Sequence, residues 1–125
     1  MKQIETRQDI QILVDTFYLK VRKDPVIQHF FNEVVDINWE AHMPTMYDFW
    51  ESLLLDNPVY KGNPMTKHIT LDGKSRMEPY HFDRWEELFI ETLDDLFTGN
   101  KVDLARQRVK DIKGLMMYKI EQARV

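Results

Sequence analysis

Apolar residues in the first part of this 125-residue chain recur three or four positions apart. That spacing places them on one face of an α-helix. The stripe consists of Ile10, Leu13, Val14, Phe17, Tyr18 and Val21. Nowhere does the sequence show the period-two alternation of a half-buried strand. The pattern predicts an all-α fold, and the length predicts one domain over residues 1–125.

Capping and breaking residues place the helix boundaries. The first helix is expected to begin at a cap formed by Thr6 or Asp9. It should end at Asp24, because a residue that precedes proline is disfavoured in the helical region. A short helix is predicted over residues 26–34.

A third helix is predicted over residues 39–55, with Pro44 near its start. Proline is tolerated in a first turn but not in a helix interior. Either the regular helix begins close to Met43, or its first turn is kinked and His42 lies on the irregular part. Asp56 and Pro58 should end this helix.

The second half of the chain has the same helical pattern. Loops are predicted over residues 60–65 and 72–75, with one or two helical turns between them over residues 65–71. A fourth helix should start at Pro79. It should end at Gly99, which is expected to cap it in the left-handed backbone conformation. A fifth should start near Asp103, with an apolar stripe that includes Ile112 and Met116.

Charge and composition exclude several classes of function. With 17 basic and 21 acidic residues the net charge is −4, so no nucleic-acid partner is expected. The chain lacks cysteine, which excludes disulfides and sulfur-ligated metal clusters. No apolar run approaches the roughly 20 residues of a membrane span, and the polar N-terminus does not resemble a signal peptide. The expectation is a cytoplasmic protein without a membrane partner.

Two histidines on separate segments suggest a cofactor site. His42 lies in a stretch that also carries Met46 and Trp50 at helical spacing, and His68 follows a loop rich in Gly and Pro. Each histidine alone is more often a structural residue than a metal ligand. Together, amid bulky apolar residues, they could face one another across a flat apolar ligand, which predicts heme. Tyr18 and Trp85 would add polar tips to the same cavity.

Five motifs are similar to a known family. They are Phe17-Tyr18-x-Lys-Val21, Phe31 after the first break, His42-Met-Pro-x-Met46-x-Asp-Phe-Trp50, Lys67-His68-x-x-Leu71, and His81-Phe-Asp-Arg-Trp85-x-x-Leu-Phe89. On these motifs the chain resembles a truncated hemoglobin of the third group, over about Asp9 to Tyr118. The resemblance implies a truncated globin fold, which is a 2-over-2 helical sandwich around heme b.

The resemblance also implies roles for single residues. His68 would bind the heme iron through Nε2 on the proximal side. Tyr18 and Trp85 would donate hydrogen bonds on the distal side. His42 would be the distal histidine, and Met46 would form an apolar wall beside it.

The remaining implied contacts surround the heme. Phe31 would pack on its face, and Trp50 would lie behind the pocket with Phe17. Lys67 and Lys61 are candidates to meet the propionates. For His81 the preferred interpretation is structural, as a cap of the fourth helix.

Three functions stay open from the sequence. The first is a heme protein that binds oxygen, nitric oxide and carbon monoxide, for oxygen, nitric oxide or peroxide chemistry rather than bulk transport. Nitric oxide dioxygenation or peroxidase-like turnover would need an external reductase. The second is a bis-histidine electron carrier in which His42 and His68 both bind iron, and the third is a cofactor-free helical interaction module. The irregular turn at Pro44 further predicts that His42 swings in and out and gates the pocket.

Overall fold

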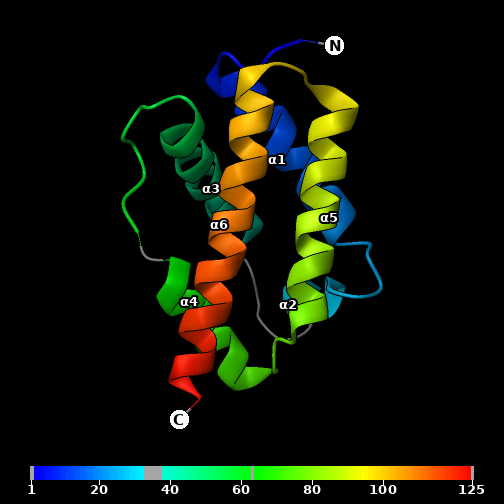
Figure 1. Ribbon diagram of the computed structural model, residues 1–125, viewed down its shortest axis with the longest axis vertical. Helices are drawn as coiled ribbons and strands as arrows, with labels where there is room; N and C mark the ends of the chain where they lie inside the picture. The colour runs from blue at the N-terminus through cyan, green and yellow to red at the C-terminus, as the bar shows by residue number, and fades with distance from the viewer. Residues whose placement is uncertain (1, 33–37, 63, 125) are drawn as a thin grey trace.

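The computed structural model describes residues 2–32, 38–62 and 64–124, without the side chains of residues 64–67 and 69. Six helices follow one another in this described part of the chain (Figure 1). They are α1 (Arg7–Val21), α2 (Gln28–Asn32), α3 (Trp39–Leu54), α4 (Pro64–Lys74), α5 (Pro79–Leu96) and α6 (Asn100–Ala123). The two ends of the chain lie at opposite ends of the molecule.

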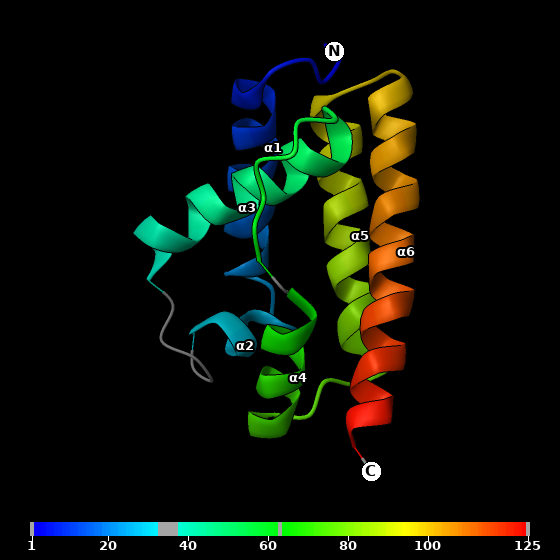
Figure 2. The ribbon, with the colours of Figure 1, turned by 90° about the vertical axis from the view of Figure 1, so that its left-hand side faces the viewer.

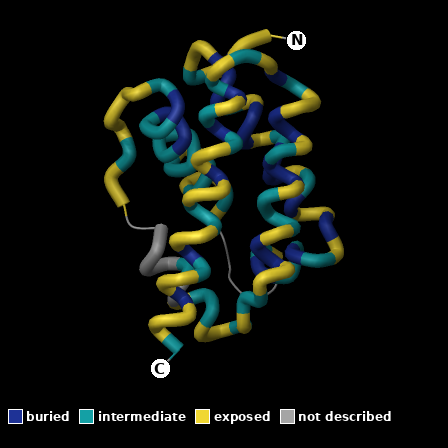
Figure 3. The backbone as a smooth tube through the Cα atoms, viewed as in Figure 1, coloured by how far each residue is buried: buried dark blue, intermediate teal, exposed yellow. Residues whose placement is uncertain are grey.

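The four longest helices form two layers. α1 packs against α3 and α5, while α6 packs against α5, α3 and α4. Figure 2 shows α3 crossing α1 on one side and α5 running antiparallel to α6 on the other, with α2 and α4 toward one end. Buried residues of α1 and α5 belong to one core cluster, and Figure 3 marks buried residues in dark blue along the backbone. The arrangement is the predicted 2-over-2 helical sandwich.

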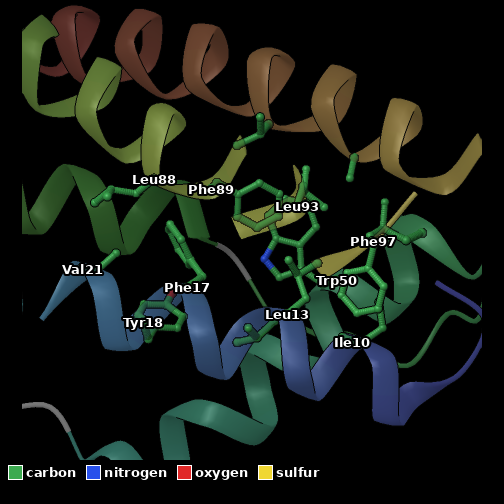
Figure 4. Packing of buried hydrophobic residues seen from close by; sticks show 14 of the residues in the cluster. Ile10, Leu13, Phe17, Tyr18, Val21, Trp50, Leu88, Phe89, Leu93 and Phe97 are labelled. Atoms are coloured by element: carbon green, nitrogen blue, oxygen red, sulfur yellow. The ribbon is translucent and has the colours of Figure 1, made fainter. Parts of the chain in front are cut away.

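Local signals explain where α1 begins and which face it buries. The Thr6 side chain accepts a hydrogen bond from the backbone N–H of Asp9, and the Asp9 carboxylate accepts one from the N–H of Thr6. This reciprocal capping box satisfies N–H groups that the first turn leaves without helical partners. Every member of the predicted apolar stripe is buried. Figure 4 shows the stripe meeting Trp50, Phe89 and Leu93.

The segment that carries His68 is more helical than the sequence predicted. α4 spans Pro64–Lys74, so most of the predicted loop over residues 72–75 is helical. A contact from the far end of the chain explains this difference. Arg124 donates two hydrogen bonds to the Asp72 carboxylate, at 2.6 and 2.9 Å, and a third to the carbonyl of Met77.

The prediction that Gly99 ends a helix is wrong. α5 ends at Leu96, and Gly99 precedes α6 as its N-cap, with φ 99° and ψ −173°. The N–H of Thr98 donates to the carbonyl of Lys2, so this connection pairs with the start of the chain. A Cβ at position 99 would also lie 3.0 Å from the Gln3 side chain. Glycine suits the site because of its positive φ and this close approach.

α6 starts three residues earlier than expected, at Asn100 rather than Asp103. The predicted apolar stripe of α6 nonetheless faces the core, where Ala105, Val109, Met116 and Ile120 are buried. Within the described residues, no helix is long and apolar enough to cross a membrane.

Candidate functional site

A cavity of about 290 Å³ lies where the helices converge. Most of its lining is apolar or aromatic, with contributions from every helix. The polar tips on its wall come from Tyr18, His42, Tyr60, His68, His81 and Trp85. Seven of the predicted site residues line it together: Tyr18, Phe31, His42, Met46, Trp50, His68 and Trp85. The Lys67 side chain lies outside the described residues, and Lys61 is exposed in the loop before α4.

Tyr18 projects from α1 into the cavity wall. Its ring lies 5.5 Å from the ring of His42 and 6.0 Å from that of Phe31, both edge-to-face. Within the described residues the hydroxyl forms no hydrogen bond to protein, and burial raises the pKa of the Tyr18 hydroxyl well above its ordinary value. The group therefore stays protonated and is a hydrogen-bond donor for whatever occupies the cavity.

His42 is the fourth residue of α3 and closes its first turn, since its N–H donates to the carbonyl of Asn38 at 2.8 Å. The helix begins at Trp39, where Asn38 caps it through a bond from the N–H of Ala41, so the alternative that it starts close to Met43 is wrong. Pro44 is inside the helix. Because proline has no N–H, the carbonyl one turn earlier lacks its helical donor, and the turn that carries His42 is held by fewer bonds than a regular turn.

Stacked aromatic rings support the wall behind Tyr18. The Trp50 ring stacks on Phe89 with centroids 4.5 Å apart, and Trp85 lies parallel to the same ring at 6.4 Å. Phe17 packs edge-on against Trp85 at 6.3 Å. These contacts hold both indoles against the core. In the described part of the chain the indole N–H of Trp85 donates to no protein group, so it too is available to a ligand.

His68 reaches the cavity from α4, on a different element from the other polar tips. The contact between Arg124 and Asp72 fixes the C-terminal end of α4 against the end of α6. The Arg124 guanidinium lowers the pKa of the Asp72 carboxyl, so the pair is charged at neutral pH. The helix that carries His68 is thus anchored at one end by an ion pair.

His81 lines the cavity at the start of α5 and is 7% exposed. Its Nδ1 accepts a hydrogen bond of 2.8 Å from the N–H of Glu78, so the neutral ring carries its proton on Nε2. This bond completes the cap of α5, which confirms the structural interpretation of His81. Burial lowers the pKa of His81, and the neighbouring His29, 5.7 Å away between ring centroids, acts in the same direction.

Several lining residues were not expected from the sequence. Tyr60 comes from the loop after α3 and packs edge-on against Phe49 at 5.1 Å, and Met77 comes from the connection between α4 and α5. A loop residue carries no periodic signal, so neither could be assigned to the cavity. Ile112 and Met116 line it from α6, and their signal was the inward stripe of that helix.

Comparison with known proteins identifies the family. The chain is 30% identical over 119 residues to the group 3 truncated hemoglobin of Campylobacter jejuni, covering 90% of this chain and 91% of that protein. The chain belongs to the group 3 truncated hemoglobin family. The fold agrees with the crystal structure of group III truncated hemoglobin from Campylobacter jejuni, with a TM-score of 0.82 at 27% identity, over 96% of this chain and 95% of that one. No family model matches the chain.

Membership of this family implies heme as the cofactor of this truncated hemoglobin. The cavity residues fit such a group. Its walls are largely aromatic and aliphatic, as a flat apolar ring requires, and imidazoles reach it from α3 and α4. Imidazole nitrogen is a common ligand for heme iron. Within the described residues no cluster of three or more histidine or carboxylate groups offers an alternative metal site.

Proposed function

We propose that this truncated hemoglobin binds heme b in the cavity through Nε2 of His68 and takes up diatomic gases on the distal side of the ring. The observation that supports this best is the composition of the wall. One imidazole from α4 and two hydrogen-bond donors from α1 and α5, Tyr18 and Trp85, line a single apolar cavity. A bound heme supplies an iron atom that takes oxygen, nitric oxide or carbon monoxide as a ligand.

Tyr18 and Trp85 act as donors to a ligand that carries partial negative charge. The Tyr18 hydroxyl keeps its proton because burial raises its pKa. Hydrogen bonds in a low-dielectric cavity are stronger than in water, so two such donors slow the release of oxygen. Slow release favours oxygen, nitric oxide or peroxide chemistry over bulk transport. Repeated turnover by nitric oxide dioxygenation or peroxide reduction would require an external reductase.

Other residues shape the site for the cofactor. Phe31, Met46 and Trp50 line the cavity; Phe31 would pack on the face of the ring, Met46 would form the apolar wall beside His42, and Trp50 would close the space behind. These side chains would keep water away from a bound gas and so strengthen the hydrogen bonds that it receives. Lys67, next to His68 in sequence, and Lys61 are the basic residues proposed to meet the propionates.

A second candidate function follows from the two imidazoles. His42 and His68 both line the cavity. If both bind iron, no position is open to a gas, and the protein is a bis-histidine electron carrier.

The visible absorption spectrum of the protein with hemin tests both functions. His68→Ala should lose or alter the sharp Soret band of the wild type, whereas His29→Ala, at a histidine outside the cavity lining, should keep it. After reduction, a Soret shift on exposure to carbon monoxide indicates an open distal position. A spectrum that carbon monoxide does not change indicates the bis-histidine carrier. No specific Soret band in the wild type would contradict heme binding and leave a cofactor-free helical interaction module.

A further inference from the structure

A second hollow lies on the outer side of the cavity wall that Tyr18 forms. It measures about 220 Å³ and lies between α1 and α3. Its lining consists of Asp15, Tyr18, Leu19, Arg22, Trp39 and Met43. Tyr18 lines both this hollow and the large cavity, so the two spaces share its side chain as a wall.

Three rings make up the partition. Trp39 lies 5.6 Å from Tyr18 and 5.4 Å from His42, and Tyr18 lies 5.5 Å from His42, all between ring centroids and all edge-to-face. Trp39 lines the hollow and His42 lines the cavity. A gas molecule in the hollow is therefore separated from the cavity by one layer of aromatic side chains.

Trp39 contacts the rings of Tyr18, His42 and Phe31, and it lies at a helix end. It is the first residue of α3, where helix ends fray, whereas Tyr18 lies inside α1 and is buried. Its outer contact is the Arg22 guanidinium, 4.5 Å from the centroid of the ring. Within the described residues that guanidinium forms no ion pair. A cation–π contact at an exposed site is weak, so thermal motion breaks it frequently.

We propose that the hollow is the access port for the gas ligand and that Trp39 is the residue that opens and closes it. The proposal rests on the proposed function, since it requires a ligand that enters the cavity. Apolar gases partition into apolar spaces, and Leu19 and Met43 provide apolar surface in the lining of the hollow. Arg22 holds the Trp39 ring closed from outside, and movement of Trp39 frees the face of His42 on which it packs.

Filling the hollow gives the first test. In Leu19→Trp the larger side chain should slow carbon monoxide association and dissociation by the same factor after flash photolysis and ligand replacement. The affinity should not change, because an access path alters both rates without altering the bound state. Leu115→Trp is the matched control, because Leu115 is a similarly exposed leucine on α6, with 47% exposure against 57% for Leu19. It should leave both rates unchanged.

Loosening the ring gives the opposite result. Arg22→Gln removes the cation–π contact and should raise both rates by about two- to fivefold, the factor that corresponds to 0.5–1 kcal/mol. Trp39→Ala should raise them further. Wild-type rates in both Leu19→Trp and Arg22→Gln would overturn the port, whereas failure of the wild type to bind hemin or carbon monoxide would overturn the proposed function itself.

A readout without gas-binding kinetics tests the hollow directly. Under xenon pressure the methyl NMR signals of Leu19 and Met43 should shift with saturation, because four of the six lining residues, Tyr18, Leu19, Trp39 and Met43, offer apolar or aromatic surface to the probe. In Leu19→Trp the shift at Met43 should be lost. Unshifted methyl signals in the wild type would show that the hollow does not admit an apolar gas.

Discussion

Nε of Arg84 donates a hydrogen bond of 2.8 Å to Oδ1 of Asp24, and this contact joins α5 to the turn before α2. The Asp24 side chain is 3% exposed, and its other oxygen accepts the N–H groups of Val26 and Ile27 at 3.1 and 3.3 Å. The carboxylate thus organises the turn from inside while Arg84 neutralises it. Since α2 carries Phe31, this pair helps to position one wall of the cavity.

Arg84→Met should destabilise the protein by about 1–2 kcal/mol, because it leaves the buried Asp24 carboxylate without its charged partner. The value is modest because the Arg84 side chain itself is only half-buried. Methionine retains most of the apolar stem, so the loss is mainly electrostatic. Urea unfolding followed by circular dichroism measures the change. Arg108→Met is the control. Arg108 is exposed, and its ion pair with Asp111 in the same helix is long, at 3.9 Å, so its loss should cost little. Equal stability of the two variants would contradict a structural role for Arg84.

The sequence predicted those parts of the fold that local patterns determine. The stripe of α1, its cap at Thr6, one of the two residues expected there, and the inward face of α6 each follow from residues within a few turns of one another. The convergence of Tyr18, His42, His68 and Trp85 on one cavity was expected because each lies on the apolar side of its own segment. Periodicity carries that information directly.

Contacts between distant residues account for the differences. Arg124 holds the end of α4 through Asp72, 52 positions earlier, and Lys2 pairs with the connection before Gly99. A short stretch of sequence does not indicate which distant residue will contact it. The same reason explains why Tyr60 was not assigned to the cavity, since its place there depends on the path of a loop.

Removal of heme should lower the thermal stability of the protein. A ligand at about 1,000 times its dissociation constant adds roughly 4 kcal/mol to a folded domain, and its loss lowers the melting temperature of a chain this size by on the order of 10 °C. The aromatic cavity of about 290 Å³ would lose its filling at the same time. Thermal unfolding of apo-protein and of hemin-loaded protein, with His68→Ala plus hemin as a control, measures the difference. Equal melting of apo and loaded wild type would contradict heme as part of the core.

Stability should fall in mild acid because of His81. Burial first, and then the charge of His29, lower the pKa of His81 below its ordinary value of 6.5, while Glu78 opposes the shift. The unfolded chain therefore takes up the proton before the folded one does. The contribution of neutral His81 to the free energy of unfolding is fully present above pH 6.5 and is lost as the pH falls toward the pKa of the folded state. For one proton the free energy of unfolding changes by at most about 1.4 kcal/mol per pH unit.

His81→Gln removes this titration and leaves an oxygen that can accept the N–H of Glu78. The melting temperature of the wild type should decrease more steeply than that of His81→Gln from pH 7 to pH 5, with the two curves parallel above pH 7. His29→Gln should give an intermediate slope, because it removes one cause of the lowered pKa. Parallel curves over the whole range would exclude His81 as the titrating group.

Tyr18→Phe should accelerate oxygen release from the hemin-loaded, reduced protein. The substitution removes one donor and keeps the ring packed against His42 and Phe31. Loss of one hydrogen bond to a charged acceptor, about 1.5–3 kcal/mol, corresponds to roughly 10- to 100-fold faster dissociation. Carbon monoxide carries less negative charge than oxygen when bound, so its dissociation should change much less. Tyr60→Phe removes the other tyrosine hydroxyl of the cavity lining and should leave both rates near those of the wild type. Stopped-flow measurement of the dissociation rates of the two gases separates the outcomes. If Tyr18→Phe releases oxygen at the wild-type rate, or if it accelerates the release of both gases equally, the hydroxyl is not a donor to the ligand.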